Sequence, residues 1–289
     1  MDDPDCIHRI RALSCWQGEI TPEPLSGGIT NRNFVVTDDR NRYVVRVCED
    51  RSFLGIDRRS ERVCHGAAAE IGVSPEIVHA EGMLLVSRFV ESHTLSDDDV
   101  ADEAMLERIA QVLQKLHGAR HELAGEMLYF CPFQTVRTYV ATAHELGAEL
   151  PEDVDTLLAD SATLAAEMRP FHPTLCHNDL LAANFLDDGP RIWLVDWEYG
   201  GMGNPLFDLA SVSANARLAP ALETTLLAAY GLSGDEAVRR EVRILKTISL
   251  LREALWSVIQ TVKSDLDFDY VKYANENFAA YQAARSELG

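Results

Sequence analysis

The N-terminal part of the chain alternates short apolar runs with turn residues, which is typical of β-structure. Alternating apolar positions over residues 33–37 and 42–47, separated by polar turn residues, predict a hairpin. Helix-forming residues fill 58–71 and stop before a glycine, which predicts a helix. A short, partly β-branched apolar run at 83–90 predicts another strand. This part of the chain is therefore predicted to be a β-β-α-β unit.

The rest of the chain has mainly the three- and four-residue apolar spacing of helices. Ser96, followed by three aspartates, predicts the N-cap and acidic first turn of a helix that runs to Leu116, and we favour this over a cation site. An interlude of short strands interrupts the helices at residues 175–176, 184–186 and 192–197, with a turn at 187–190. The pattern as a whole predicts an α+β fold.

Two stripes run along the helical pattern between residues 244 and 262. The first stripe is apolar and consists of Ile244, Ile248, Leu251, Leu255, Val258 and Val262. The second lies about 150° away around the helix and consists of Ser249, Glu253, Trp256 and Gln260. A tryptophan beside a carboxylate on a face away from the core is a ready pair for an organic cation. A subunit interface or a packing tryptophan is the alternative.

Composition narrows the classes of partner. The chain has 289 residues, with 46 acidic against 26 basic side chains and a net charge of −20. This balance argues against nucleic acid and anionic membrane surfaces as partners. No apolar stretch approaches 18 residues, the start of the chain lacks the features of a signal peptide, and the six cysteines form no C-x-x-C pair. We therefore expect a cytoplasmic protein with reduced thiols.

The strongest chemical signal is the segment that begins His177-Asn178-Asp179 and ends five residues later at Asn184, followed by Asp196 at the end of an apolar run. This H-x-D-x-x-x-x-N spacing with a later aspartate is the pattern of a kinase catalytic loop and its magnesium ligand. We expect Asp179 to accept the proton of a hydroxyl, with His177 as the other catalytic residue of the motif. Asn184 and Asp196 supply the oxygen ligands that Mg²⁺ prefers. A simple turn would not require the aspartate at the end of the later strand.

The N-terminal part supplies a matching phosphate site. Gly27 and Gly28 allow the backbone to approach a phosphate, Arg46 lies near the end of a strand, and Glu61 lies in the next helix, where it can pair with Arg46. Each of these signals is weak alone, and their order relative to the catalytic loop strengthens them. The chain contains no GxxxxGK[ST] sequence, which excludes a Walker-type phosphate loop.

Together, residues 25–34, 176–180, 195–199 and 255–260 resemble the bacterial choline/ethanolamine kinases of the aminoglycoside-phosphotransferase superfamily. The resemblance extends from about residue 20 to about residue 282. It implies a two-lobed, protein-kinase-like fold, with a β-rich nucleotide-binding lobe over 1–90 and a mainly helical catalytic and substrate-binding lobe over 91–289. It also implies ATP and Mg²⁺ between the lobes, next to a hinge. The implied nucleotide-binding residues beyond those above are Thr30, Asn31, Arg88, Phe89 and Val90.

The resemblance further implies a pocket for a small cationic amine, formed by Glu198, Tyr199, Glu253, Trp256, Phe268 and Tyr273. Aromatic faces attract quaternary ammonium groups, so choline is the expected acceptor. Two positions depart from the eukaryotic choline kinases: Glu253 stands where they have tryptophan, and Asn215 stands where they have glutamate. Ethanolamine or an aminoglycoside remains an alternative substrate, and a catalytically silent binding protein with a kinase fold is the alternative from another class. The oligomeric state is left open.

Overall fold

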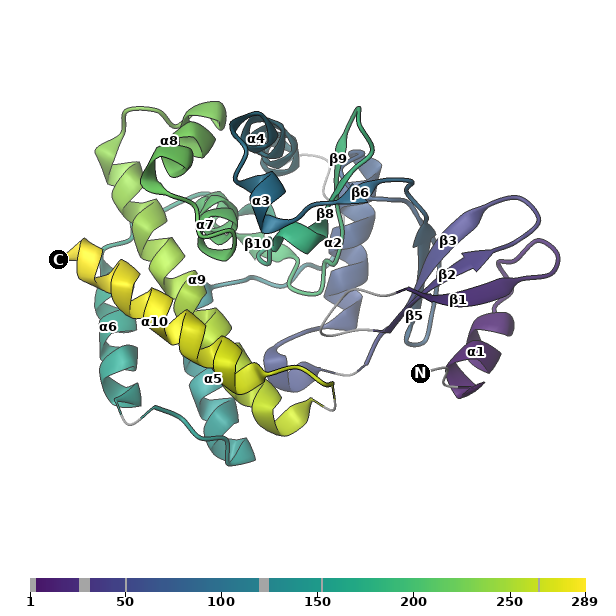
Figure 1. The fold of residues 1–289 in the computed structure, drawn as a ribbon, viewed down its shortest axis with the longest axis horizontal. Helices are drawn as coiled ribbons and strands as arrows, with labels where there is room; N and C mark the ends of the chain where they lie inside the picture. Colours follow the sequence, from purple (N-terminus) through teal and green to yellow (C-terminus); the bar gives the residue numbers. More distant parts are fainter. Residues whose placement is uncertain (1–3, 26–31, 50, 120–124, 152, 265) are drawn as a thin grey trace.

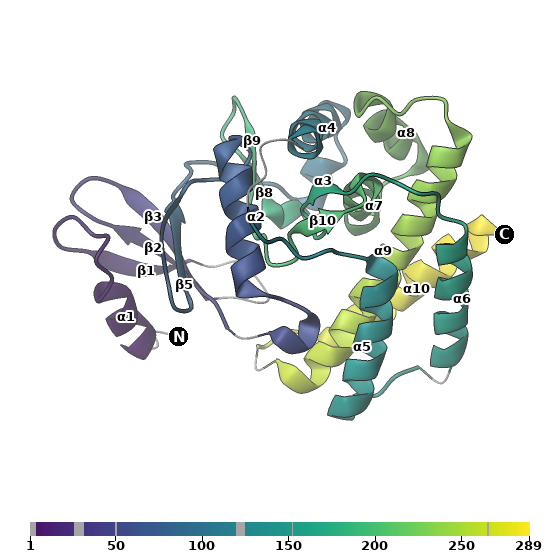
Figure 2. The ribbon, with the colours of Figure 1, turned by 180° about the vertical axis from the view of Figure 1, so that it is seen from behind.

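The computed structural model describes residues 4–25, 32–49, 51–119, 125–151, 153–264 and 266–289. A β-sheet with the N-terminal helix lies at one end of the molecule, and a mostly helical part lies at the other (Figures 1 and 2). The expected division into a β-rich N-terminal part and a helical C-terminal part is therefore confirmed. Among the described residues, no helix combines the length and apolarity needed to cross a bilayer.

The N-terminal part contains one five-stranded sheet. Its elements are α1 (Pro4–Arg11), β1 (Thr21–Leu25), β2 (Arg32–Thr37), β3 (Arg42–Val47), the 3-10 turn η1 (Ser52–Leu54), α2 (Arg58–Glu70), β4 (Ile77–Glu81) and β5 (Leu84–Arg88). The strand order is β1-β2-β3-β5-β4, and every neighbouring pair is antiparallel. The predicted hairpin and helix are present, whereas α1, β1 and β4 were not predicted.

The alternation of β3 gives the sheet two different faces. Val45 and Val47 pack with α1 in a small apolar core. Val44 and Arg46 point to the other face, toward the helical part, and Arg46 lies opposite Leu85 in the register of β3 with β5. The sheet therefore carries an arginine on the face that meets the rest of the molecule.

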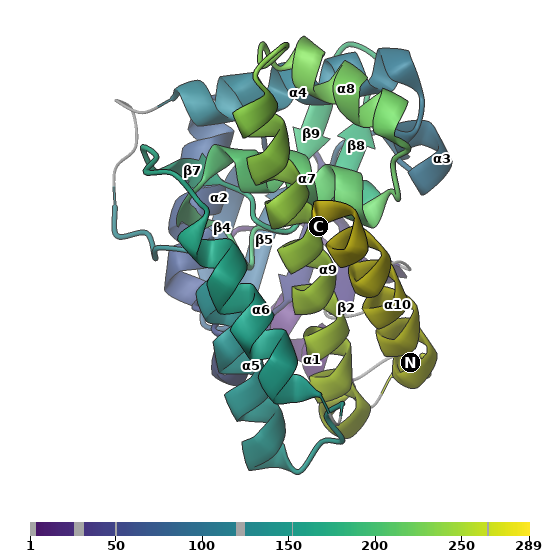
Figure 3. The ribbon, with the colours of Figure 1, turned by 90° about the vertical axis from the view of Figure 1, so that its left-hand side faces the viewer.

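The C-terminal part is built around one long helix. Its elements are β6 (His93–Thr94), α3 (Asp97–Val100), α4 (Glu103–Gly118), α5 (Pro132–Leu146), α6 (Val154–Ala166), β7 (Thr174–Cys176), the 3-10 turn η2 (Ala182–Asn184), β8 (Phe185–Asp187), β9 (Ile192–Leu194), β10 (Gly201–Gly203), α7 (Pro205–Asn215), α8 (Pro220–Ala229), α9 (Glu236–Lys263) and α10 (Tyr270–Leu288). Helix α9 packs against α5, α7 and α10 (Figure 3).

Helix α9 differs from the expectation of one core face and one outer face. Every residue from Thr247 to Gln260 is buried, so both stripes are covered. Val262, which we assigned to the apolar stripe, is 48 % exposed because it lies near the end of the helix. Trp256 is 4 % exposed, so it does not form an open subunit interface.

The helix predicted from Ser96 to Leu116 is interrupted. Ser96 does cap α3, and Asp99 completes a capping box with it. The chain then turns at Ala101, and Asp102 caps the separate helix α4 by accepting from the backbone N–H of Met105. Two caps in close succession explain the break, because each satisfies the free N–H groups of its own helix.

The two parts are joined by hydrogen bonds as well as by the chain. Between α2 and β4, the Val73 carbonyl accepts from the N–H of Leu194 at 2.8 Å. The Ser74 hydroxyl donates to the Leu194 carbonyl at 2.8 Å and accepts from the indole N–H of Trp197 at 3.1 Å. These bonds fasten the sheet side to strand β9.

Candidate active site

The predicted catalytic loop leaves β7 in a backbone conformation that is fixed from behind. Asp208, in the first turn of α7, accepts from the N–H of His177 at 2.9 Å and from the N–H of Asn178 at 2.7 Å. Asn178 has a φ of 64°, in the left-handed region that asparagine tolerates better than most residues. This turn presents the next residue, Asp179, toward the interior of the molecule.

Asp179 has a 13 % exposed side chain and forms an ion pair with Arg252 of α9. Burial raises the pKa of the Asp179 carboxyl group, and the charge of Arg252 acts in the opposite direction. A carboxylate in such a setting is suited to take a proton from a hydroxyl group.

Asn184 and Asp196 lie together beside this carboxylate. The Asn184 side-chain N–H donates to the backbone carbonyl of Asp179 at 2.8 Å, which leaves its amide oxygen for another partner. Asp196 follows β9 with a φ of 67°, and its Oδ1 lies 2.6 Å from Nη2 of Arg46. Amide and carboxylate oxygens with excess negative charge nearby fit a hard cation such as Mg²⁺.

Arg46 is the centre of a buried charge network that joins the sheet to the helical part. Besides its contact with Asp196, the guanidinium of Arg46 lies 3.2 Å from the carboxylate of Glu61 and 3.0 Å from that of Glu198. The pairing of Arg46 with Glu61 that we predicted is present. Arg58, which the sequence analysis missed, contacts the same two glutamates at 2.8 and 3.0 Å.

His177 does not fit the catalytic role that we expected. Its side chain is completely buried, donates from Nε2 to the Val195 carbonyl at 2.8 Å, and packs on Trp197. Burial lowers the pKa of His177, which keeps the ring neutral. The residue can therefore act on the site only by fixing the backbone next to Asp196, and it is a positioning residue.

A cavity of about 390 Å³, here the sheet-side cavity, lies between the sheet and the catalytic loop. The strands and the segment after β5 contribute Asn33, Val44, Arg46, Leu85, Ser87, Arg88, Phe89 and Val90, and the helical part contributes Ala183, Asn184, Leu186, Val195 and Asp196. The three residues predicted near the hinge thus line this cavity. The predicted Gly27, Gly28, Thr30 and Asn31 lie outside the described residues.

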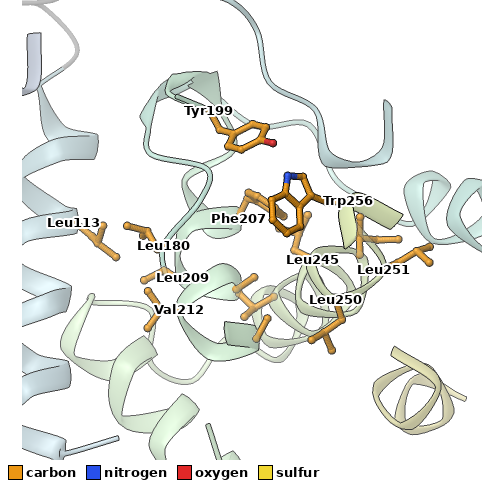
Figure 4. Packing of buried hydrophobic residues seen from close by; sticks show 14 of the residues in the cluster. Leu113, Leu180, Tyr199, Phe207, Leu209, Val212, Leu245, Leu250, Leu251 and Trp256 are labelled. Atoms are coloured by element: carbon orange, nitrogen blue, oxygen red, sulfur yellow. The ribbon is translucent and has the colours of Figure 1, made fainter. Parts of the chain in front are cut away.

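A second cavity of about 290 Å³, here the helix-side cavity, lies on the other side of the catalytic loop. The six residues predicted for the amine all line it: Glu198, Tyr199, Glu253, Trp256, Phe268 and Tyr273. Asp179 lines it as well. Figure 4 shows the rings of Trp256 and Tyr199 on one side of α9, above the apolar side chains of α7 and α9.

The walls of the helix-side cavity are hydrogen-bonded to one another. The hydroxyl of Tyr273 donates to Oε1 of Glu253 at 3.1 Å, and the hydroxyl of Tyr139 donates to that of Tyr199 at 2.9 Å. The guanidinium carbon of Arg252 lies 4.8 Å from the centre of the Tyr199 ring. One face of Tyr199 is therefore already taken by a cation of the protein itself.

Sequence reasoning missed Arg252 and Asp97 as lining residues of this cavity. Arg252 lies four residues before Trp256 and so shares its side of the helix, which was the available signal. The aspartates after Ser96 were read only as cap residues. Asn215, at the other departure from the eukaryotic pattern, donates to the carbonyl of Leu180 at 3.0 Å and supports the catalytic loop.

A buried group behind the loop resembles a metal site but is internally satisfied. The described residues contain one group of His, Cys, Asp or Glu side chains close enough together to share a cation, and it consists of His117, Cys176 and Asp208. The ring of His117 bonds to Asp208 at 2.9 Å and to the hydroxyl of Tyr230 at 2.8 Å. Asp208 also holds the loop amides, so this group orients the catalytic loop.

Comparison with known proteins agrees with this geometry. Residues 21–245 match APH, the phosphotransferase enzyme family. The chain belongs to this family. It is thus an ATP-dependent phosphotransferase, and the enzyme class that we expected is confirmed.

This chain has relatives along nearly its whole length. It is 26 % identical to the protein LicA of Haemophilus influenzae, over 91 % of this chain and 79 % of LicA. It is 27 % identical to ethanolamine kinase 2 of Mus musculus, over 99 % of this chain and 82 % of the mouse protein. The crystal structure of a choline/ethanolamine kinase family protein from Mesorhizobium loti is similar, with a TM-score of 0.80, 27 % identity, and 97 % and 94 % of the two chains covered. These similarities confirm the predicted kinase-like α+β fold.

Proposed function

We propose that this enzyme transfers the γ-phosphoryl group of ATP to the hydroxyl of a small amino alcohol, and that choline is its substrate. One observation carries the proposal: the sheet-side and helix-side cavities share Ala183, Asn184 and Asp196 as a common wall, and Asp179 lines the helix-side cavity next to it. A phosphoryl donor in one cavity and a hydroxyl in the other would meet at this wall.

The residues at the wall divide the chemistry between them. Asp179 accepts the proton of the acceptor hydroxyl as its oxygen attacks phosphorus. Asn184 and Asp196 would hold Mg²⁺, which neutralises the charge that develops on the phosphates. Arg46 faces the same wall and would contact the phosphates, with Glu61 orienting its guanidinium.

The sheet-side cavity suits the nucleotide. It has an apolar floor, provided by Val44 and Leu85, and the backbone of residues 88–90 at its edge, where an adenine can find hydrogen-bonding groups. Gly27, Gly28, Thr30 and Asn31 would contribute to phosphate binding, as the resemblance of their sequence to nucleotide-binding glycine loops implies.

The helix-side cavity suits a small cation. Glu253, which is 6 % exposed, supplies a carboxylate, and Trp256, Phe268 and Tyr273 supply aromatic faces around it. Glu198 is less available than we expected from the sequence, because Arg46 and Arg58 hold its Oε2. The volume of about 290 Å³ lies at the small end of ligand sites, which favours a small amino alcohol over a multi-ring aminoglycoside.

Ethanolamine is the second candidate, and Glu253 is the observation that favours it. A carboxylate can accept hydrogen bonds from a primary ammonium, whereas trimethylammonium has no N–H to donate. Because Tyr199 already has Arg252 over one face, the aromatic surface left for a quaternary ammonium is smaller than the sequence implied.

The test is a methylation series under one set of conditions: ethanolamine, its N-methyl and N,N-dimethyl derivatives, and choline. ADP formation gives kcat/KM for each acceptor, with ATP and Mg²⁺ saturating. If aromatic faces dominate, kcat/KM rises with each methyl group and is largest for choline. A steady fall toward choline would assign the enzyme to ethanolamine instead. Transfer to an aminoglycoside alone, or no transfer at all, would overturn the proposal.

A further inference from the structure

Arg252 is a buried charge in the helix-side cavity for which the proposed reaction has no use. Its side chain is 4 % exposed and lies among the acidic and aromatic residues expected to bind a cation. A positive charge here competes with a cationic substrate. Burying a guanidinium is also unfavourable unless charged partners compensate for it. Its presence therefore requires an explanation beyond packing.

The contacts of Arg252 join two elements. Its Nη1 donates to the backbone carbonyl of Asn178 at 2.8 Å, and its Nη2 donates to Oδ1 of Asp179. The same Nη2 lies 3.5 Å from Oε2 of Glu253. The fork of one guanidinium thus holds both the main chain of the catalytic loop and the carboxylate that the loop presents.

The position of Arg252 on α9 links this contact to the acceptor site. Glu253 is the next residue, and Trp256 is one turn further along. A single helix therefore carries the groups proposed to bind the amine and the group that fixes Asp179. The distance between the bound cation and Asp179 is then set by α9, because both are held by side chains of this one helix.

We propose that Arg252 is a positioning residue, which fastens the catalytic loop to α9 and so holds the Asp179 carboxylate at a fixed distance from the amine-binding groups. This proposal rests on the proposed function, because it assumes that Asp179 serves as the base. It assigns Arg252 no contact with ATP. Loss of Arg252 should thus impair the chemical step more than the binding of either substrate.

The experiment measures kcat and both KM values for Arg252→Lys and Arg252→Ala, each alone and combined with Asp179→Asn. Misplacing a catalytic group by about 1 Å costs roughly 100-fold, so we expect the kcat of Arg252→Ala to fall by about that factor with a small change in the KM of ATP. Lysine keeps the charge but lacks the forked guanidinium, so the kcat of Arg252→Lys should lie between those of the wild type and Arg252→Ala. Added guanidinium should restore part of the activity of Arg252→Ala. Arg243→Ala, which removes an exposed ion pair with Glu236 on the same helix, is the matched control.

The combined variants separate positioning from other roles. If Arg252 acts through Asp179, adding Arg252→Ala to Asp179→Asn causes little further loss. Full additivity of the two losses, or a rise in the amine KM with kcat unchanged, would overturn the proposal. A wild type that phosphorylates no amino alcohol refutes the proposed function instead. In that case the wild type, Arg252→Ala, Asp179→Asn and the combination of these two substitutions are compared by thermal unfolding. If the two substitutions then show no energetic coupling, the contact itself is refuted.

Discussion

At the scale of single residues, the proposed roles of Asp179 and of the nucleotide site are separable. Replacing Asp179 by Asn removes the base but keeps the size of the side chain. We expect kcat to fall by about 10²- to 10⁴-fold, which is the usual contribution of a general base. The dissociation constant of ATP, measured by calorimetry, should stay nearly unchanged because Asp179 lines the helix-side cavity only. A variant with near wild-type turnover would contradict the assignment.

Replacing Asp196, in contrast to Asp179, should affect the binding of the nucleotide. Asp196→Asn removes one negative charge where we place Mg²⁺, so nucleotide binding should weaken and require more metal. Titrating Mg²⁺ against ATP binding in both proteins checks this. Identical curves would place the metal elsewhere. Asp155→Asn, at an exposed side chain in the first turn of α6, is a control with the same change of charge.

His65 makes stability depend on pH. Burial lowers the pKa of His65 from 6.5 to about 4, and the ring bonds to the carbonyl of Pro75 at 2.8 Å. Between these pH values the unfolded chain binds a proton that the folded protein does not, so stability falls as the pH falls and levels off below about 4. The loss amounts to at most about 3 kcal/mol. In His65→Gln, denaturant unfolding at pH 7 and pH 4.5 should show a smaller difference than in the wild type, and an equal difference would refute the inference.

At the scale of elements, α9 gives the sharpest test of the amine site. A cation on an aromatic face is worth roughly 0.5 to 2 kcal/mol, so Trp256→Ala should raise the KM of the amine by about two- to thirtyfold, with little change for ATP. Glu253→Gln should act in the same direction, and more strongly for ethanolamine than for choline. Initial rates with each substrate varied check both variants. Amine kinetics that stay unchanged in both variants would refute the proposed amine site.

The elements that could be predicted from the sequence are those whose side chains show a clear period. The hairpin β2–β3 and helix α2 have such a period, and the short strands around the catalytic loop are indicated by the turn residues 187–190. Strand β1 does not, because Pro22 and Pro24 lie in it, and prolines are tolerated there only because β1 is an edge strand. Strand β10 is Gly-Met-Gly, which has almost no side chains to form a pattern.

More of the candidate site than of the fold around it could be predicted from the sequence. Asp179, Asn184 and Asp196 follow a spacing that only a particular chemistry requires, and the structure brings them together. Arg252, Arg58 and the burial of His177 depend on contacts between elements that are far apart in the sequence, so no local pattern reveals them. The fixed spacing of residues in the sequence indicates the chemistry of the site. The contacts that support these residues can be seen only in the tertiary structure.

At the scale of the whole molecule, the bonds of Ser74 join the sheet to the helical part. Ser74→Ala removes the hydroxyl that bonds to both Leu194 and Trp197, and it leaves two buried groups without that partner. We expect a loss of about 1 to 3 kcal/mol in the free energy of unfolding, measured in denaturant. If the bonds also hold the two parts in register, the KM values of both substrates should rise together. Ser286→Ala, at an exposed serine near the end of α10, is the control.

The common wall of the two cavities also constrains the order of events. If donor and acceptor bind in the two cavities proposed for them, which meet at Ala183, Asn184 and Asp196, neither has to leave before the other enters. Phosphorus would then pass directly from one oxygen to the other in a single in-line displacement, with one inversion of its configuration and no phosphorylated form of the enzyme. An enzyme built in this way forms a ternary complex, and its initial-rate lines intersect instead of running parallel.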